Sequence, residues 1–381
     1  MPNVFNEGII ALALKTKRKH IRCAQCKQAP PRLRSGQAAL QSSRMLHGED
    51  GQPGGNWRRG HGVPCPYEEL TGGAENGGDS MKADTLIIVN PVSGGGGALA
   101  AEPHVRDFLA ARGRSVQFVH SRSAEDVREL AAKGAASGYR FIVALGGDGA
   151  FHYVVEGVLG TNAIAGFFPA GGGNDIARDL GIPADPVRAA AAFLKSKPRA
   201  VDVVRVRFRD GRTAHFIGAG GMGLDAEAAR LANTRFRGWP GATRYLAGAL
   251  VTFFSERPLE LSAEMDRTRW AGRALFAAVA NSTSYGSGVR IAPEAKMDDG
   301  WLNVVLVEEM KWTRLFEAIP IVLGSGDLRF DEVKRFRCKR VVLKAERPAM
   351  VHGDGEELGE APAEFEVVPG AVRVMAPVTG A

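Results

Sequence analysis

The pattern of hydrophobic and polar positions after residue 80 alternates between two kinds of segment. Short apolar runs typical of buried strands are separated by longer stretches with helical spacing. This alternation is typical of βαβ units, in which helices cover a mainly parallel sheet. The predicted strands are 86–89, 115–120, 140–145 and 163–168, and the predicted helices are 103–112, 124–137 and one that follows Gly173.

The pattern changes near residue 201. Beyond it, strand-like text dominates, as in VDVVRVRF and CKRVVLKAE, and two helical stretches at 225–233 and 312–323 interrupt it. The sequence therefore predicts a second, largely antiparallel β domain after the α/β domain.

The first 80 residues have a different composition. They are rich in Gly, Pro, Arg and Gln, and they lack steady periodicity, as disordered segments do. We expect Met81 to be the biological start, with an over-long gene model before it. Cys23 and Cys26 have the spacing of zinc ligands, but no matching second pair follows, so we expect no zinc site.

Charge excludes one class of partner. Of the 49 Lys/Arg and 42 Asp/Glu residues, 11 and 7 lie in the first 80 positions, which leaves 38 against 35 for the rest. The globular part is nearly neutral, so we expect no nucleic-acid partner.

Three glycine-rich segments follow three successive predicted strands. They are NPVSGGGG at 90–97, GGDGAFH at 146–152 and FPAGGGNDIARDLG at 167–181. Glycine allows close backbone approach, so that N–H groups can converge on an anion, and ligands of doubly wound sheets bind at the carboxyl ends of strands. The pattern predicts a phosphate-binding edge. The Gly-Lys-Ser/Thr ending of a P-loop is missing, which argues against a Walker-type NTPase.

Three side chains in these segments have two interpretations each. Asp148 either holds Mg²⁺, directly or through water, or fixes the loop by accepting backbone N–H bonds. Asn174 or Asp175 either caps the helix that follows or belongs to a helix start that presents N–H groups to phosphate.

The β-rich half contains two acid-rich turns and one misleading motif. The turns are APEAKMDDGWL at 292–302 and HGDGEELG at 352–359, where turn chemistry alone accounts for the Asp-Gly pairs. Gly218, Gly220 and Gly223 fit G-x-G-x-x-G, but no acidic residue stands near the expected ribose position about 20 residues on. We expect no dinucleotide fingerprint there.

Taken in order, these motifs resemble those of a known family. NPVSGG, GGDG, PAGGGND, G-x-GLDA at 221–226, APEAKMDDGWL and HGDGE are similar to the soluble lipid kinases of the diacylglycerol kinase catalytic-domain family, which also covers sphingosine and ceramide kinases. The resemblance runs from about residue 85 to residue 377. It implies an α/β plus β fold: a doubly wound α/β nucleotide domain at 81–203 and a C-terminal β-sandwich domain for the lipid at 204–359. The final segment, about 360–381, would return to the first domain.

The resemblance also implies roles for single residues. ATP and Mg²⁺ would be the cofactors. Glu356 matches the presumed proton acceptor, with Asp354 beside it, and phosphoryl transfer needs such a carboxylate besides positioning and charge neutralisation. Lys296, Asp299 and Trp301 match a Mg²⁺ site in which Lys296 and Trp301 contribute main-chain carbonyls. The implied nucleotide-binding residues are Asn90, Pro91, Ser93, Gly94, Ser121, Gly146, Gly147, Asp148, Gly149, His152, Gly172, Asn174 and Asp175.

Two departures from the family pattern keep alternatives open. The family reads GGDGT and P-x-G-T where this chain has Ala150 and Gly172, so two hydroxyls expected near phosphate are missing. Without them the chain could be a nucleotide- or lipid-binding protein lacking turnover, and a soluble-substrate kinase such as an NAD kinase is a further alternative. The retained acids favour a lipid kinase that transfers the γ-phosphate of ATP to a hydroxyl, with diacylglycerol as the expected acceptor and phosphatidate as the product.

The expected location follows from the substrate. The sequence shows no secretory signal and no apolar run of about 18 residues. We expect a cytoplasmic protein that touches the inner face of the membrane peripherally to reach its lipid. Arg235, Arg237, Trp239 and Arg244 are candidates for interfacial contact, and a solvated basic loop is an equal alternative. The sequence leaves a homodimer open.

Overall fold

The computed structural model describes residues 83–223, 258–285, 288–324 and 328–377, with a few single residues between 224 and 257. The first 82 residues, most of the predicted helix 225–233, and Arg237, Trp239 and Arg244 lie outside the described residues. Within these described ranges, no helix has the length and apolarity needed to cross a bilayer.

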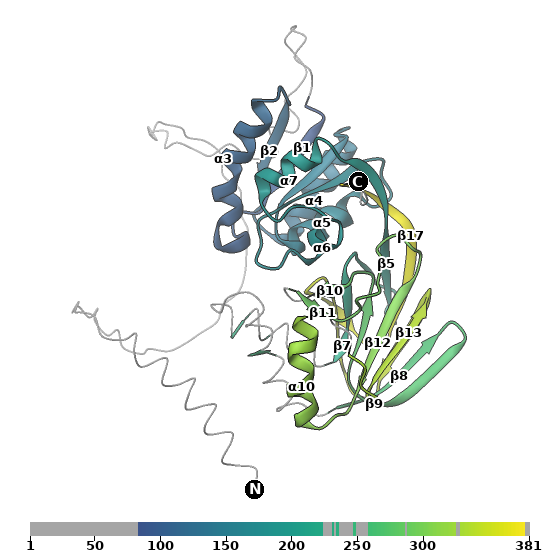
Figure 1. Ribbon diagram of the computed structural model, residues 1–381. Coiled ribbons are helices and arrows are strands. Elements are labelled where there is room, and N and C mark those ends of the chain that lie inside the picture. The colour runs from purple at the N-terminus through teal and green to yellow at the C-terminus, as the bar shows by residue number, and fades with distance from the viewer. Residues whose placement is uncertain are drawn as a thin grey trace, which may run out of the picture. The chain divides into compact units, whose positions relative to one another are not determined.

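The first domain is a parallel sheet covered by helices (Figure 1). Its strand order is β4-β3-β1-β2, so that successive strands along the chain lie on both sides of β1. The strands are β1 (Thr85–Val89), β2 (Val116–His120), β3 (Phe141–Gly146) and β4 (Ile164–Pro169). The helical elements are η1 (Ser93–Gly95), α3 (Gly97–Ala110), α4 (Ala124–Ala136), α5 (Asp148–Val158), α6 (Asp175–Asp179) and α7 (Pro186–Phe193).

The sequence pattern predicted these strands to within two residues but not all of the helices. The helix expected at 103–112 begins earlier, at Gly97, because the left-handed Gly96 starts it and Pro103 lies inside it. Helix α7 was not predicted. Helix α5 begins inside the segment that we expected to be a loop, because Gly147 is its N-cap and most of its apolar residues are buried against the rest of the domain.

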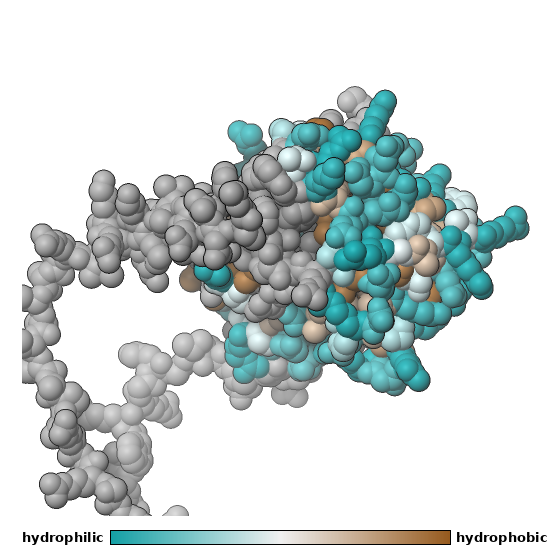
Figure 2. Space-filling view, turned by 90° about the horizontal axis from the view of Figure 1, so that it is seen from below, coloured by the Kyte–Doolittle hydropathy of each residue, from teal (hydrophilic) through white to brown (hydrophobic). Residues whose placement is uncertain are grey.

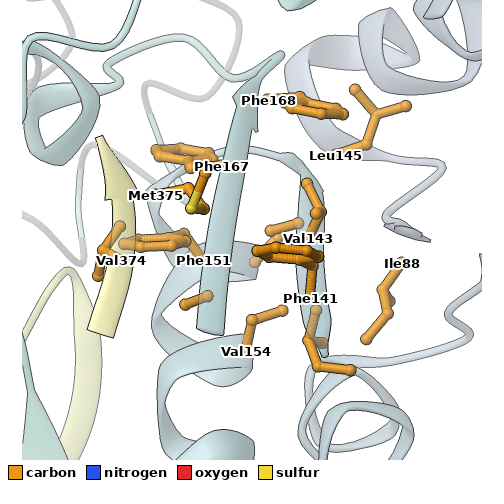
Figure 3. Packing of buried hydrophobic residues seen from close by; sticks show 14 of the residues in the cluster. Ile88, Phe141, Val143, Leu145, Phe151, Val154, Phe167, Phe168, Val374 and Met375 are labelled. Atoms are coloured by element: carbon orange, nitrogen blue, oxygen red, sulfur yellow. The ribbon is translucent and has the colours of Figure 1, made fainter. Parts of the chain in front are cut away.

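The core of this domain forms where α5 packs on the sheet. The rings of Phe151 and Phe167 are stacked, with centroids 4.6 Å apart and planes 8° apart, and the end of the chain adds Val374 and Met375 to the same cluster (Figure 3). Phe141 and Phe193 meet edge to face at 5.4 Å. Such aromatic pairs contribute about 0.5–1.5 kcal/mol beyond burial, so α5 is held rigidly against β4.

The second domain is antiparallel and has a core of its own. Inward and outward positions alternate along its strands, as in β8, because one face packs on that core. Its elements are β5 (Lys197–Phe208), β6 (Thr213–Phe216), β7 (Ala219–Gly223), β8 (Leu259–Met265), β9 (Thr268–Ala280), β10 (Ser284–Tyr285), β11 (Val289–Arg290), β12 (Leu302–Glu308), α10 (Trp312–Leu323), β13 (Val333–Cys338), β14 (Arg340–Ala345), β15 (Met350–Gly353), β16 (Glu356–Glu360) and β17 (Ala363–Ala376). The predicted helix 312–323 is confirmed, as is the α/β plus β fold.

The last strand joins the two domains. The first half of β17 pairs with β14, and its second half reaches β4, where Val374 lies opposite Ala165 in a parallel pairing. Strand β5 runs antiparallel to β17 along most of its length. Strand β5 spans the boundary that we expected between residues 203 and 204. The domain limits inferred from the sequence stay predictions.

Candidate functional site

The three glycine-rich segments meet at the carboxyl edge of β1, β3 and β4. The backbone N–H of Asn90 donates to Leu145 O at 3.0 Å, and that of Ala170 donates to Gly146 O at 2.6 Å. A Cβ added to Gly94 would lie 2.1 Å from the carbonyl oxygen of Ala170. Since Gly94 also has a φ of +61°, only glycine fits where the first and third segments touch.

The second segment is in contact with both of the others. The backbone N–H of Gly147 donates to Ser93 Oγ at 3.3 Å, and a Cβ on Gly171 would lie 2.6 Å from Gly147 Cα. The side chain of Asn90 closes a local turn, in which its Oδ1 accepts the N–H of Val92 at 3.3 Å. Of the predicted nucleotide-binding residues, this edge brings together Asn90, Pro91, Ser93, Gly94, Gly146, Gly147, Asp148 and Gly149.

Helix α5 gives this edge its electrostatic character. Its first residue is Asp148, so the expected loop 146–152 consists of the end of β3, the N-cap Gly147 and the first turns of a helix. The first N–H groups of a helix have no partner within it, and the helix dipole places partial positive charge there. The arrangement suits a phosphate group.

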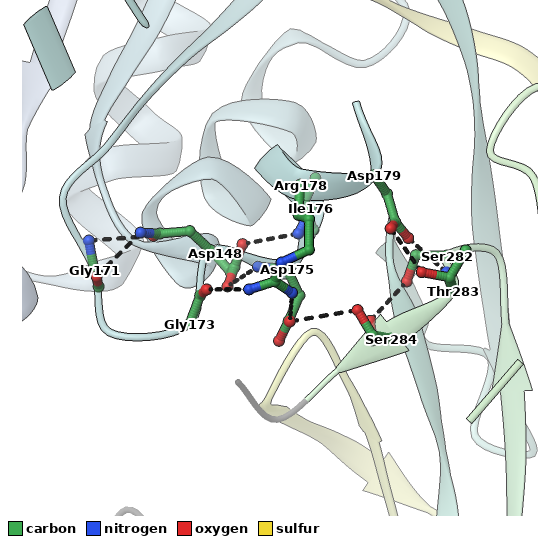
Figure 4. A network of polar contacts seen from close by, with 11 residues as sticks. Asp148, Gly171, Gly173, Asp175, Ile176, Arg178, Asp179, Ser282, Thr283 and Ser284 are labelled. Carbon is green, nitrogen blue, oxygen red and sulfur yellow. Dashed lines mark hydrogen bonds and ion pairs between the residues drawn. The ribbon is translucent and has the colours of Figure 1, made fainter. Parts of the chain in front are cut away.

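Asp148 caps a neighbouring helix from outside. Its Oδ2 accepts the N–H of Asp175 at 3.0 Å and its Oδ1 accepts the N–H of Ile176 at 3.2 Å, as Figure 4 shows. Burial, and after it the negative charge of Asp175, raise the pKa of Asp148 to about 7 although the two N–H bonds lower it. Of the two interpretations of Asp148, the structure shows the carboxylate fixing backbone N–H groups.

Asn174 and Asp175 do not cap α6 with their own side chains. Asn174 is left-handed, with a φ of +55°, and its amide bonds back to Gly171: Oδ1 accepts the N–H at 3.2 Å and Nδ2 donates to the carbonyl at 3.1 Å. Asp175 is buried and pairs with Arg178 at 2.5 Å. Of the two interpretations that the sequence left open, capping by Asn174 or Asp175 is not what the structure shows, because the capping carboxylate comes from Asp148, 27 residues earlier.

The remaining nucleotide candidates differ in exposure. Ser121 is buried at the end of β2, and its Oγ donates to Val89 O at 3.3 Å. Gly172 is exposed at the top of the third segment. Ala150 is 4% exposed, and a Cβ on Gly146 would lie 2.7 Å from its methyl carbon, so it packs directly on the end of β3.

His152 and Asp354 form a buried pair between the domains. Their side chains are 2% and 1% exposed, and His152 Nδ1 lies 2.9 Å from Asp354 Oδ2. Asp354 also accepts the N–H groups of Ile217 at 2.9 Å and Gly218 at 2.8 Å. Burial lowers the pKa of His152, but the hydrogen bond and charge of Asp354, aided by nearby Glu156, raise it by more, so that its pKa lies above that of free histidine.

This pair explains a glycine that the sequence left without a purpose. A Cβ on Gly218 would lie 2.7 Å from Asp354 Oδ1, so the carboxylate reaches the backbone only because no side chain is there. Its neighbours Gly220 and Gly221 belong to β7 and allow close packing against β15 and β9. GAGGMG is therefore a strand rather than a dinucleotide loop, as expected.

Glu356 lies against the start of α5. Its Oε2 accepts the hydroxyl of Tyr153 at 3.2 Å, and its Oε1 would lie 3.0 Å from a Cβ on Gly149. Burial, and then the charge and hydrogen bond of Glu356, raise the pKa of Tyr153. Sequence reasoning missed Tyr153, since a tyrosine inside a helical run gives no local sign of its partner.

Two residues of the predicted Mg²⁺ site, Asp299 and Trp301, are engaged in other contacts. Asp299 Oδ2 pairs with Arg337 at 2.6 Å, and its Oδ1 accepts the N–H of Trp301 at 3.1 Å. The Arg337 guanidinium also lies over the Trp301 ring, 5.0 Å from its centroid. Among the described residues, no group of three or more His, Cys, Asp or Glu side chains is placed to hold a metal. The carboxylate of Asp299, the one side-chain donor of the predicted set, is engaged by Arg337, and the metal role of Lys296, Asp299 and Trp301 stays a prediction.

Asp202 anchors the same loop. It is 2% exposed, and its carboxylate accepts the N–H groups of Gly300 at 2.7 Å and Gly370 at 2.8 Å. Sequence reasoning missed this residue as well, because its two partners lie 98 and 168 residues away.

A second polar contact joins α6 to the β domain. Asp179 accepts the N–H of Thr283 at 2.5 Å and its hydroxyl at 2.7 Å, and Ser284 Oγ donates to Asp175 at 3.4 Å (Figure 4). Burial raises the pKa of Asp179. The glycine edge, α6 and the β9–β10 connection therefore form one continuous polar network.

Comparison with known proteins finds matches for both domains of the chain. The diacylglycerol kinase catalytic domain model matches residues 84–206, and the YegS C-terminal NAD kinase beta sandwich-like domain model matches residues 218–376. A crystal structure of a diacylglycerol kinase from Bacillus anthracis has a TM-score of 0.61 at 20% identity, over 79% of this chain and 99% of that one, which supports the fold.

The chain matches two curated relatives over nearly their whole length. The diacylglycerol kinase of Mycobacterium tuberculosis is 32% identical over 297 residues, 77% of this chain and 95% of the relative. A Pseudomonas aeruginosa protein named "probable lipid kinase YegS-like" is 29% identical over 289 residues, 74% of this chain and 92% of its own. The chain therefore belongs to the diacylglycerol kinase catalytic-domain family, and it is a phosphotransferase with an alcohol acceptor.

Proposed function

We propose that this protein transfers the γ-phosphate of ATP to a lipid hydroxyl, with diacylglycerol as the acceptor and phosphatidate as the product. One observation carries the proposal: the carboxylate of Glu356 lies against the first turn of α5, where the three glycine-rich segments meet. A proton acceptor beside a phosphate-binding helix start is what phosphoryl transfer to a hydroxyl requires.

The chain supplies binding and positioning. Backbone N–H groups of the glycine-rich segments and of the start of α5 bind the phosphates, and Asp148 fixes α6 beside them. Glu356 takes the proton of the acceptor hydroxyl. Asp354 orders the β15–β16 turn instead of meeting the acceptor, because its carboxylate is buried in three hydrogen bonds.

Mg²⁺ enters this scheme with the nucleotide. We expect it to arrive bound to ATP, as part of the substrate, where it neutralises phosphate charge. The engaged donors of Asp299 give no reason to route the reaction through the loop at 296–301.

A lipid acceptor requires contact with a bilayer surface. The described residues on the face shown in Figure 2 are mostly hydrophilic, with scattered hydrophobic positions. Over all the described residues, the exposed large hydrophobic side chains are Val92, Leu99 and Met350. Arg235 is exposed, while its predicted partners Arg237, Trp239 and Arg244 lie outside the described residues. Peripheral membrane contact is therefore part of the proposal, and flotation with anionic liposomes measures it.

The test is transfer of labelled γ-phosphate from ATP in mixed micelles, with diacylglycerol, sphingosine or aqueous NAD as acceptor. We expect label in the organic phase with diacylglycerol, and a loss of at least about a hundredfold in Glu356→Gln. Glu357→Gln is the matched control, since Glu357 is the exposed neighbour on the same strand. Label confined to the aqueous phase would favour a soluble-substrate kinase, and full activity of Glu356→Gln would remove its role.

A protein that binds nucleotide without turnover is the second candidate, favoured by Ala150 and Gly172. Thr at position 172 faces open solvent, whereas Thr at 150 must fit a site where Ala150 is 4% exposed. Transfer that appears only after both residues are changed to Thr, while the natural chain binds ATP, would establish this candidate.

A further inference from the structure

We propose that Tyr153 is a positioning residue for Glu356: its hydroxyl holds one carboxylate oxygen so that the other faces the start of α5. This inference rests on the proposed function, in which Glu356 accepts the proton of the acceptor hydroxyl. It assigns a role to a residue that no motif singles out.

Two consecutive side chains of α5 hold the turn that carries Glu356. His152 reaches Asp354 at 2.9 Å and Tyr153 reaches Glu356 at 3.2 Å, so both ends of the β15–β16 turn are tied to one helix. The two rings brace each other edge to face, with centroids 4.9 Å apart. Because the same helix begins at the glycine edge, this arrangement sets the place of the carboxylate relative to bound phosphate.

The two oxygens of Glu356 have different surroundings. Oε2 accepts the Tyr153 hydroxyl, while Oε1 lies beside the backbone of Gly149 at the first turn of α5. A phenol has one proton to donate, so it selects one oxygen and fixes the orientation of the carboxylate. The oxygen left toward the phosphate edge is Oε1, and it is the one that takes the proton.

Tyr153 acts as a donor at neutral pH. Burial and the negative charge of Glu356 raise its pKa, which keeps the phenol protonated. A hydrogen bond to a charged acceptor contributes about 1.5–3 kcal/mol, enough to hold a side chain in one orientation. If Tyr153 only supported the fold, removing its hydroxyl would lower turnover by the same factor with or without Glu356. If it positions Glu356, the loss should depend on Glu356, and the experiment tests this dependence.

The experiment compares wild type, Tyr153→Phe, Glu356→Gln and the double variant. We expect Tyr153→Phe to lower kcat about tenfold or more, with KM for ATP within about twofold, because the loss acts on orientation of the base. In the Glu356→Gln background the same change should alter the residual rate less than about twofold. Tyr139→Phe is the matched control and should match wild type, since that hydroxyl donates to Gln117 on the edge strand β2.

The proposal is overturned if Tyr153→Phe keeps wild-type kcat, or loses the same factor in both backgrounds. If wild type transfers no phosphate, the proposed function fails, and an alkaline titration of ¹³C-labelled tyrosines by NMR still tests the contact. The pKa of Tyr153 should fall in Glu356→Gln while that of Tyr139 stays unchanged. An unmoved Tyr153 pKa would overturn the inference independently of turnover.

Discussion

Asp148 links two helices through one carboxylate. It begins α5 and caps α6 by accepting the N–H groups of Asp175 and Ile176. Because it is buried next to Asp175, its pKa is raised to about 7. Keeping Asp148 ionised in this buried position therefore lowers the stability of the folded protein, by an amount that depends on pH.

This property predicts the pH dependence of stability. An unfolded aspartate has a pKa of about 3.9, and the folded value of Asp148 is about 7, so its contribution is present below about pH 4 and is lost as pH rises through about 7. A difference of one pKa unit corresponds to about 1.4 kcal/mol of unfolding free energy. We expect wild type to lose stability over this range relative to Asp148→Asn, which keeps one of the two acceptors.

Urea unfolding at several pH values measures this difference. Asp210→Asn is the control, since Asp210 is exposed and its pKa is lowered by Arg212, so its effect should be small and opposite in sign. Parallel pH profiles for wild type and Asp148→Asn would contradict the prediction.

The loop at 296–301 and strand β13 form a second local unit. Arg337, on β13, both pairs with Asp299 and covers the Trp301 ring, and Lys339 Nζ lies 5.3 Å from the centroid of the same ring. One cation, Arg337, therefore pairs with the carboxylate of the predicted Mg²⁺ site, and a second, Lys339, lies over the neighbouring indole ring. Arg337 of β13 thus neutralises the negative charge of Asp299 in the loop.

We expect the stability of the nucleotide-free protein to be independent of Mg²⁺. The melting temperature should be the same with Mg²⁺ or with a chelator, because Arg337 already neutralises Asp299. In Arg337→Ala the carboxylate is released, and Mg²⁺ should then raise the melting temperature. Arg207→Ala removes an exposed arginine from different ion pairs, with Glu364 and Glu366, and should show no response to Mg²⁺. A wild-type melting temperature that falls on chelation would contradict this.

The two domains are joined by buried hydrogen bonds as well as by strands. Strands β5 and β17 run together through the junction, and Asp202 on β5 holds Gly300 of the β domain and Gly370 at the bulge of β17. The buried His152–Asp354 pair and the Asp179–Thr283 contact join them at the site. The position of Glu356 relative to the glycine edge therefore depends on the whole junction.

Asp202→Ala tests this dependence. The change leaves two part-buried N–H groups, those of Gly300 and Gly370, without their acceptor, so we expect the unfolding free energy to fall by about 1–3 kcal/mol, with kcat falling as well. Asp298→Ala is the matched control, because that exposed carboxylate pairs only with Arg199 among the described contacts, and it should cost less than about 1 kcal/mol. Chemical denaturation together with the micelle assay measures both quantities. Equal losses of stability and kcat in the two variants would show that the contacts of Asp202 do not hold the domain junction.

Local pattern was enough for much of the fold. The strands at Thr85–Val89 and Phe141–Gly146, the order of the glycine segments and the change to antiparallel text near 201 are all visible in the sequence, because side-chain periodicity and glycine conformation are local properties. Helix α5 was missed because Gly-Asp-Gly is typical of a loop when its neighbours are unknown.

The amino-acid sequence by itself determined the two-domain class, the three glycine-rich segments and the family to which their motifs belong. Each of these can be recognised from residues that are close together in the chain. Only the tertiary structure decided the partners. His152 meets Asp354 and Tyr153 meets Glu356 across 202 and 203 residues, and Asp148 caps α6 in place of Asn174. Such pairs arise when the ends of parallel strands and a distant hairpin are brought to one place, and no periodicity along the chain records where a side chain will find its acceptor.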